Sequence, residues 1–260
     1  MQTSHFTSGE PAVVITRITH QLWHALEDDQ VAGRGEATTR PDGRTFLSID
    51  AWHRSVFDQL ADAMLADLPV SSYTVVDETD AELLAGWERA GFTIRRRERE
   101  YLVPTRQAPV TPPPGVTLVP RGSASEGPLR ELDRVIRAEV EASVGWQEMP
   151  AEVLPRPDGD TIVDPALYAA AASGGSYVGL VRVVQVTRLP RIGLLAVRAD
   201  QRRRGIARAL LTDVLGSLHA AGIPTASAEV KETNPAATAL FDSLGARRSG
   251  GSLELVRHGE

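Results

Sequence analysis

The spacing of apolar residues in the second half of the chain predicts alternating strands and helices. Leu129, Leu132, Ile136 and Val140 recur at helical spacing, which predicts an amphipathic helix. The turn signal SGGS separates two runs that we interpret as strands, although the alanines of YAAAA favour a helix when taken alone. The expected order is a strand GVTLVP, the amphipathic helix, strands near 167–172, 176–186 and 191–197, a helix over 205–220, a strand over 226–231, a helix over 235–244 and a strand near 252–257.

The chain also carries an internal repeat. The segment VVDETDAELLAGWERAGF (75–92) aligns without gaps with EVKETNPAATALFDSLGA (229–246), each a strand followed by a short helix that ends at a glycine. LWHALEDDQVAG (22–33) resembles YAAAASGGSYVG (168–179), each two strand-like runs around a polar turn. A repeat of this length predicts duplicated domains rather than a solenoid.

A proline-rich segment, PTRQAPVTPPPG (104–115), separates the two copies and predicts a stiff linker. We therefore expect one domain over 1–105 and a second over 116–260. The pattern predicts an α/β fold with a mixed sheet in the second domain and a reduced copy of it in the first. The reduced copy reads TFLSIDAWHRSVFDQL where the second reads IGLLAVRADQRRRGIARALL, so it keeps the strand and the helix but lacks the loop between them.

Composition excludes several functional classes. The 260 residues include no cysteine, which rules out disulfides and thiolate chemistry, and the net charge of -6 argues against a nucleic-acid partner. We expect no membrane partner and a cytoplasmic location, because the first twenty residues do not resemble a signal peptide and no apolar run would span a bilayer. His20 and His24 lack a third ligand, so no metal site is expected, and the charged run IRRREREY (94–101) predicts an edge strand.

Arg202, Arg203 and Arg204 directly precede the helix expected over 205–220. The start of a helix carries the positive end of its dipole, so cations there are unfavourable unless an anion binds. Unpaired amides of the first turn, Gly205 and the small Ala207 would together accept a pyrophosphate. A solvated basic loop capped by Asp200 is the alternative.

The stretch RRRGIA (202–207) resembles the Arg/Gln-x-x-Gly-x-Gly/Ala signature of the GNAT superfamily of N-acetyltransferases. NPAATALFDSLGA resembles a second motif of that family, and the tandem layout resembles that of mycothiol synthase, with one active and one degenerate domain. The resemblance implies acetyl-CoA as the co-substrate, with pantetheine along Leu195, Ala196 and Val197. It also implies contacts of the cofactor with Arg202, Arg203, Arg204, Gly205, Ile206, Ala207 and Asn234. Asn234, which is followed by Pro235, is equally expected to cap the next helix.

Candidate catalytic groups are less clear. The family often places a tyrosine at the position of Phe241, which has no proton to donate, so the resemblance leaves the acid open to Tyr177, Tyr168 or a water molecule. Both tyrosines also fit packed strand positions. Glu229 is the candidate base, or simply an exposed strand residue. The alternatives are Glu148, in the same loop as Trp146, and a chain of water molecules; the backbone of Val197 is expected to contact the oxyanion.

The resemblance implies an enzyme that transfers an acetyl group from acetyl-CoA to a primary amine of a small molecule, without a metal. The second domain would be catalytic, and the first a non-catalytic half-domain that walls the acceptor site. The protein is expected to be a monomer or a homodimer. Two alternatives stay open: a non-catalytic sensor of acyl-CoA, and acetylation of a protein or peptide amine.

Overall fold

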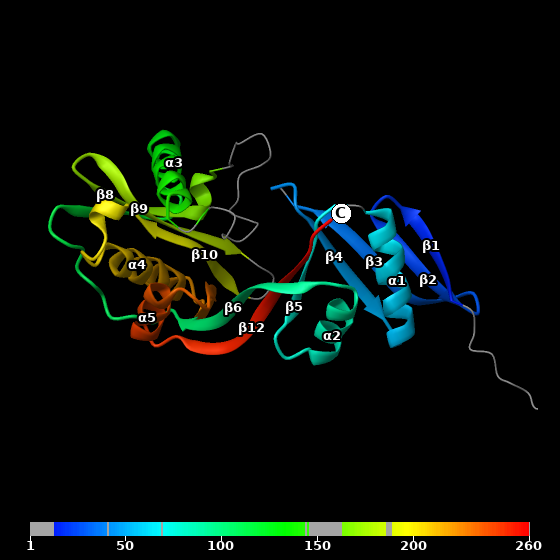
Figure 1. Cartoon of the computed structure of the whole chain (residues 1–260). Helices are drawn as coiled ribbons and strands as arrows, with labels where there is room; N and C mark the ends of the chain where they lie inside the picture. The colour runs from blue at the N-terminus through cyan, green and yellow to red at the C-terminus, as the bar shows by residue number, and fades with distance from the viewer. Residues whose placement is uncertain are drawn as a thin grey trace, which may run out of the picture. The chain divides into compact units, whose positions relative to one another are not determined.

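The computed structural model describes residues 13–40, 42–68, 70–143, 145, 163–185 and 189–259 (Figure 1). Trp146 and Glu148 lie outside these ranges. The chain divides into two compact units, Met1–Arg96 with Leu253–Glu260, and Arg97–Ser252. This division differs from the domain boundary that the proline-rich segment predicts. It falls inside two strands, Thr93–Pro104 and Arg247–Arg257. Residues 98–104 of the first of these pair with a strand of the second unit.

The first unit is a sheet with two helices packed against it. Phe57 and Trp87, one from each helix, meet edge to face with ring centroids 5.2 Å apart in its core. The strands of its sheet follow the order β1-β2-β3-β4-β5-β12-β6. The elements are β1 (Val14–Thr19), β2 (Leu22–Glu27), β3 (Gln30–Thr39), β4 (Thr45–Ala51), α1 (Arg54–Asp67), β5 (Ser72–Asp77), α2 (Ala81–Arg89) and β6 (Thr93–Pro104).

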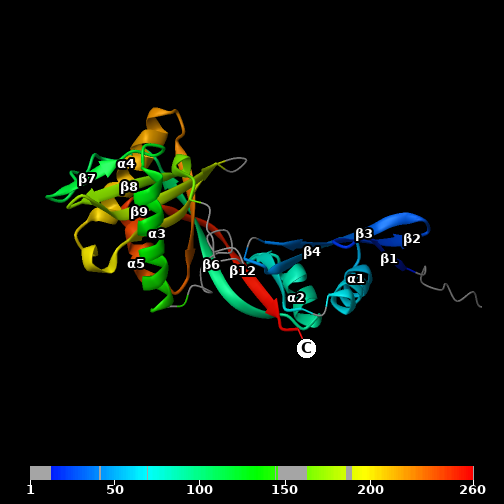
Figure 2. The same cartoon turned by 90° about the horizontal axis from the view of Figure 1, so that it is seen from above.

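The second unit has three layers. One apolar core lies between the sheet and α4 with α5, and another lies between the opposite face and α3 (Figures 1 and 2). Its strands follow the order β12-β6-β11-β10-β9-β8-β7. The elements are β7 (Val116–Val119), α3 (Glu126–Glu141), η3 (Pro165–Leu167), β8 (Tyr168–Ser173), β9 (Ser176–Gln185), β10 (Pro190–Val197), η4 (Ala199–Gln201), α4 (Ile206–Ala220), β11 (Thr225–Lys231), α5 (Pro235–Ser243) and β12 (Arg247–Arg257).

The internal repeat is confirmed as a repeat of structure. Both copies contain an antiparallel meander and a parallel strand pair joined through a helix, β4-α1-β5 and β10-α4-β11. Asp80 and Asn234 occupy matching positions, and each accepts a hydrogen bond from a backbone N–H in the first turn of its helix, at 2.9 and 3.1 Å. The strand expectation for YAAAA is also confirmed, because this segment lies in β8.

The expectation of an edge strand over 94–101 is wrong. This run lies within β6, which has β12 on one side and β11 on the other. The arginines here do not protect an edge: Arg96 is 5% exposed, and its guanidinium lies 3.7 Å from the buried carboxylate of Glu254. Alternating charge resembles an edge strand in the sequence, but here it reflects buried ion pairs.

Candidate functional site

The turn before α4 has the backbone geometry that an anion site needs. Gly205 is the N-cap residue of the helix and has a left-handed conformation with φ 85°. A Cβ atom at this position would meet only Pro113 Cγ, at 3.9 Å. Packing therefore does not require the glycine, but the backbone angle does, because other residues rarely adopt it. Arg203 also has a positive φ, of 60°, so the loop bends sharply just before the helix.

The backbone amides of this turn are available to a ligand. The first intrahelical hydrogen bond of α4 runs from Ala209 N–H to the Gly205 carbonyl at 3.0 Å. Within the described ranges, the N–H groups from Arg203 to Arg208 make no backbone hydrogen bond. The first turn contains no acidic side chain to cap them. Unpaired N–H groups and the helix dipole together favour a bound anion, and the residues present fit a pyrophosphate.

The three arginines of the sequence motif have different partners in the structure. Arg202 donates from Nε to the Val197 carbonyl at 3.1 Å, and its Nη2 lies 3.4 Å from a carboxylate oxygen of Glu139. Arg204 bonds Gln201 and donates to the Pro114 carbonyl at 3.3 Å. Of these three arginines, only Arg203 has an exposed guanidinium for which the described part of the chain provides no partner.

Strands β10 and β11 separate beside this turn. Their parallel ladder contains only the pairs Arg191 with Ser227 and Ile192 with Ala228, although β10 continues to Val197 and β11 to Lys231. On its other side β10 stays paired with β9 as far as Val197, with a register shift at Gly193. The edge of β10 that faces β11 is therefore unpaired where the resemblance implies a pantetheine arm, at Leu195, Ala196 and Val197.

Carboxylates lie next to this opening, on the face of the sheet that α3 covers in part. Glu229 is the next residue of β11 after the last one paired with β10, and its carboxylate lies 3.2 Å from Arg191 Nη1. Glu100 of β6 is its direct cross-strand partner, and its exposed side chain has no ion pair among the described residues. Like charges in such a pair repel each other, so a cation between them would be stabilised.

Phe241 lies on the other face of the sheet and stacks on Tyr101 of β6, with ring centroids 6.1 Å apart and an angle of 15° between the rings. Arg99 bonds Glu232 at 3.0 Å, and hydrogen bonds to Glu232 and to the Tyr101 hydroxyl raise the pKa of Arg99. Tyr101 and Arg99 lie two residues apart on β6. From Tyr101 to Arg99 the strand runs in the direction in which β10 and β11 separate, because Tyr101 pairs with Ala228 and Arg99 with Val230.

The tyrosines proposed from the sequence both lie near α3. Tyr177 accepts a hydrogen bond from Ser125 N–H at 3.0 Å and so holds the start of α3. Tyr168 is buried beneath α3, and burial raises the pKa of its phenol. The sequence interpretation missed Tyr101 because its strand precedes the linker and was assigned to the other domain.

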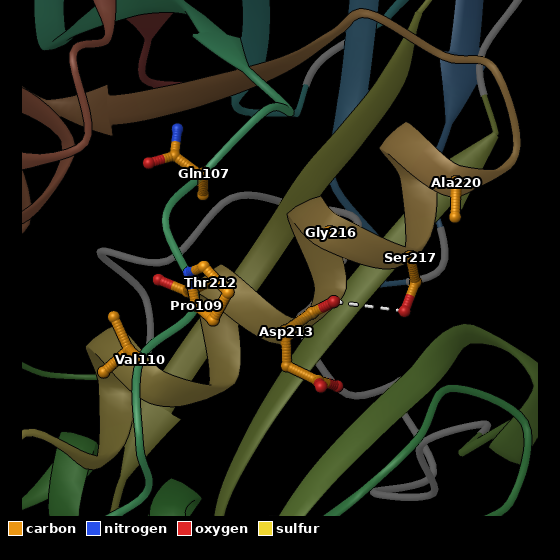
Figure 3. Close-up of a pocket in the computed structure, with 8 residues that line it drawn as sticks. All are labelled: Gln107, Pro109, Val110, Thr212, Asp213, Gly216, Ser217 and Ala220. Carbon is orange, nitrogen blue, oxygen red and sulfur yellow. Dashed lines mark hydrogen bonds between the residues drawn. The ribbon is translucent and has the colours of Figure 1, made fainter.

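A cavity of about 360 Å³ lies between the proline-rich segment and the outer face of α4 (Figure 3). It is lined by Gln107, Pro109, Val110, Thr212, Asp213, Gly216, Ser217 and Ala220. None of these residues belongs to the turn at Gly205 or to the opening between β10 and β11, so the cavity is separate from the candidate site.

The described residues contain no cluster of three or more His, Cys, Asp or Glu side chains suited to a metal.

Comparison with known proteins agrees with this geometry. The part of the chain over 133–246 matches the model of the acetyltransferase (GNAT) family. The match covers somewhat less than half of the chain, and over these residues the chain is similar to a GNAT acetyltransferase domain. The matched part contains the separated strands, the turn at Gly205 and Asn234, while β6 lies before it.

Two curated relatives match parts of the chain. Mycothiol acetyltransferase of Streptomyces coelicolor is 34% identical over 84 residues, which cover 32% of this chain and 27% of the relative. The [ribosomal protein bS18]-alanine N-acetyltransferase of Escherichia coli K12 is 43% identical over 51 residues, which cover 20% of this chain and 34% of the relative. The matches thus span about a third, or less, of the length of either relative.

Solved structures resemble nearly the whole chain. A GCN5-related N-acetyltransferase from Sphaerobacter thermophilus has a TM-score of 0.66 at 17% identity, over 94% of this chain and 82% of its own. A tandem GNAT protein from the clavulanic acid biosynthesis pathway has a TM-score of 0.64 at 14% identity, over 97% of this chain and 85% of its own. At these identities the likeness concerns the fold alone, and it extends over both units.

The first unit repeats the strand separation but not the anion-binding turn. Its β4 and β5 pair only at Thr45 with Ser72 and at Phe46 with Tyr73. Between β4 and α1 the chain has only Trp52 and His53, and the His53 side chain makes no capping hydrogen bond. This unit therefore lacks the loop that carries Arg202, Arg203, Arg204 and Gly205 in the second. No helix in the described part of either unit is long and apolar enough to span a membrane.

Proposed function

We propose that the protein is an N-acetyltransferase that moves an acetyl group from acetyl-CoA to a primary amine of a small molecule. The observation that carries the proposal is the separation of β10 from β11 next to the unpaired amides at the start of α4. Extended backbone and a helix N-terminus in this order suit a ligand with an amide-containing arm and a pyrophosphate. Acetyl-CoA supplies an activated acetyl thioester.

The residues around the opening support the transfer. We propose that Glu229 takes a proton from the ammonium group of the acceptor, after which the amine nitrogen bonds to the acetyl carbon and the carbon–sulfur bond breaks. Backbone N–H groups near Val197 stabilise the developing oxyanion. The Tyr101 hydroxyl gives its proton to the thiolate and regains one from the nitrogen, which loses its second proton as the amide forms. The products are an amide and free CoA, and Glu229 releases the first proton to solvent.

Charge supports a cationic small molecule as the acceptor. Glu100 and Glu229 face each other across β6 and β11, and only Glu229 has an arginine partner at 3.2 Å. An amine held between two carboxylates is stabilised as the ammonium form and loses its proton to one of them during the reaction. Ser227, two residues before Glu229 on the same face of β11, is 7% exposed and has no hydrogen bond to any described residue, so its hydroxyl is available to the acceptor.

The test uses Ala207→Glu and its neutral isostere Ala207→Gln. Ala207 lies in the first turn of α4, so a carboxylate there would repel a pyrophosphate by about 1 to 4 kcal/mol, depending on the local dielectric. We expect calorimetry to show at least about tenfold weaker acetyl-CoA binding for Ala207→Glu and a much smaller change for Ala207→Gln. The unliganded Glu variant should be more stable by about 0.3–1 kcal/mol, because the carboxylate complements the helix dipole.

Equal affinities for the two Ala207 variants would contradict the site. Release of thiol from acetyl-CoA with a panel of small amines then separates the enzyme from the alternatives. Binding without thiol release would favour an acyl-CoA sensor, an alternative suggested by the missing hydroxyl at Phe241. Turnover with peptides alone would favour a protein acceptor.

A further inference from the structure

Glu139 connects α3 to the loop between β10 and α4. Its carboxylate oxygens accept hydrogen bonds from the backbone N–H of Ala199 at 3.0 and 2.8 Å. One of these oxygens lies 3.4 Å from Nη2 of Arg202, whose Nε donates to the Val197 carbonyl at 3.1 Å. A single carboxylate and a single guanidinium thus hold the first turn of the loop and the last residue of β10.

The geometry of Arg202 matters because a guanidinium presents its donors in a rigid fork. Two donors of this fork, Nε and Nη2, already have partners within the protein. Binding a phosphate in a bidentate manner through these atoms would break the bond to Val197 and separate the cation from Glu139. The positive charge of Arg202 is also balanced by Glu139, so it adds little attraction for an anion.

Arg203 has the opposite environment. Its guanidinium is exposed and has no ion pair or hydrogen bond with any described residue, and its φ of 60° is maintained although it is unfavourable for a side chain of this kind. An uncompensated cation next to the unpaired amides of the turn attracts an anion more strongly than a paired one. Arg202 and Arg203 are adjacent in the sequence, yet their surroundings suit different tasks.

We propose that Arg202 and Glu139 are positioning residues, which fix the end of β10 so that its free edge can bind the pantetheine arm, and that Arg203 is the side-chain partner of the pyrophosphate. This inference rests on the proposed function. It changes the role that the motif RRRGIA implies for Arg202, from a ligand of the cofactor to a support of the strand that binds it.

Two acetyl donors distinguish the roles. S-acetylpantetheine carries the same thioester and amide arm as acetyl-CoA but no pyrophosphate. Removing a phosphate partner lowers kcat/KM for acetyl-CoA only, whereas disturbing the strand end lowers it for both donors. We expect Arg202→Ala to reduce kcat/KM by roughly tenfold or more with both donors, since small displacements of a substrate have effects of this size. We expect Arg203→Ala, the matched control, to reduce it with acetyl-CoA alone.

Glu139→Gln gives an independent readout. The amide keeps the shape of the side chain but loses the charge. Glu139→Gln should therefore reduce kcat/KM with both donors, as Arg202→Ala does, but by a smaller factor. The double variant should be no worse than Arg202→Ala, because both residues act through one connection. If Arg202→Ala fails to fold, as judged by thermal unfolding, Arg202→Lys replaces it, since lysine lacks the fork.

A penalty for Arg202→Ala that appears with acetyl-CoA and disappears with S-acetylpantetheine would overturn the inference and make Arg202 a phosphate ligand, leaving the proposed function intact. Additive effects of Glu139→Gln and Arg202→Ala would also overturn it. If the wild-type protein transfers acetyl from neither donor to any amine, both the proposed function and this inference are wrong.

Discussion

At the scale of single residues, Phe241 of α5 has no hydroxyl, but it stacks on Tyr101 of β6, which has one. The two rings stack with centroids 6.1 Å apart. A phenol on the neighbouring strand thus lies beside the position where the resemblance implies a tyrosine. Thiolates leave without help near neutral pH, so a nearby donor assists the step rather than enabling it.

Exchange of the hydroxyl between these residues tests the assignment. We expect Tyr101→Phe to lower kcat by roughly ten- to a hundredfold while KM for acetyl-CoA changes little, because the loss concerns only the proton transfer. Adding Phe241→Tyr to this variant should restore most of the lost rate. Steady-state kinetics over a range of pH provide the measurement, and a double variant as slow as Tyr101→Phe would contradict the role.

The sequence predicted those site residues whose roles are local. Asn234 could be identified as a cap because an Asn-Pro cap depends on neighbouring residues only, and this cap is confirmed. Gly205 was expected to let the backbone approach a ligand, and its left-handed N-cap conformation is a finding of the structure. The partner of Arg202 could not be identified, because Glu139 lies 63 positions earlier on another helix. Glu100 and Tyr101 were missed for the same reason. The proposed roles of Glu229 and of the arginines stay predictions.

At the scale of elements, glycines control how closely a helix approaches its sheet. A Cβ at Gly179 of β9 would lie 3.1 Å from Leu210 Cδ1, 3.3 Å from Ile206 Cγ2 and 3.3 Å from Val197 Cγ2. The last two belong to the start of α4 and the end of β10, which form the candidate site. Gly33, the matching position in the first unit, would place a Cβ 2.8 Å from Val56 and 2.9 Å from Leu60 of α1.

Alanine at either glycine should therefore destabilise the protein but affect binding differently. We expect Gly179→Ala to lower the free energy of unfolding by about 1–3 kcal/mol, and to weaken acetyl-CoA binding because α4 and β10 must move apart. Gly33→Ala is the control: similar crowding should destabilise the first unit and leave the affinity unchanged. Thermal unfolding and calorimetry measure both effects. An unchanged affinity for Gly179→Ala would show that the helix start tolerates displacement.

Most elements were predicted because their signals are local. The meander, the helix over 205–220 and the caps follow from periodicity and turn residues, and all are confirmed. The neighbours of β6 could not be predicted in this way. Its charged alternation indicates a solvated strand, whereas the pairing with β11, from Pro104 with Thr225 to Glu98 with Lys231, depends on residues more than a hundred positions away.

At the scale of the whole molecule, β6 and β12 each contribute residues to both units. In the first unit β5 is followed in the sheet by β12, the last strand of the chain, and in the second β11 is followed by β6, which precedes the linker. Leu253 and Leu255 of β12 accordingly belong to the core around Trp87, while Tyr101 and Val103 of β6 belong to the core beneath α4. A cut in the proline-rich segment therefore separates the second unit from one of its own strands.

Two truncated chains test this arrangement, one covering 97–252 and the other 111–252. The shorter chain loses the burial of Tyr101 and Val103, about 1.5–3 kcal/mol for each, and exposes β11 as an apolar edge. That loss is a large share of the roughly 5–15 kcal/mol that stabilises a domain, so we expect 111–252 to aggregate or to lack a cooperative unfolding transition. The longer chain should unfold cooperatively in circular dichroism. If both chains fold equally well, β6 is dispensable for the second unit.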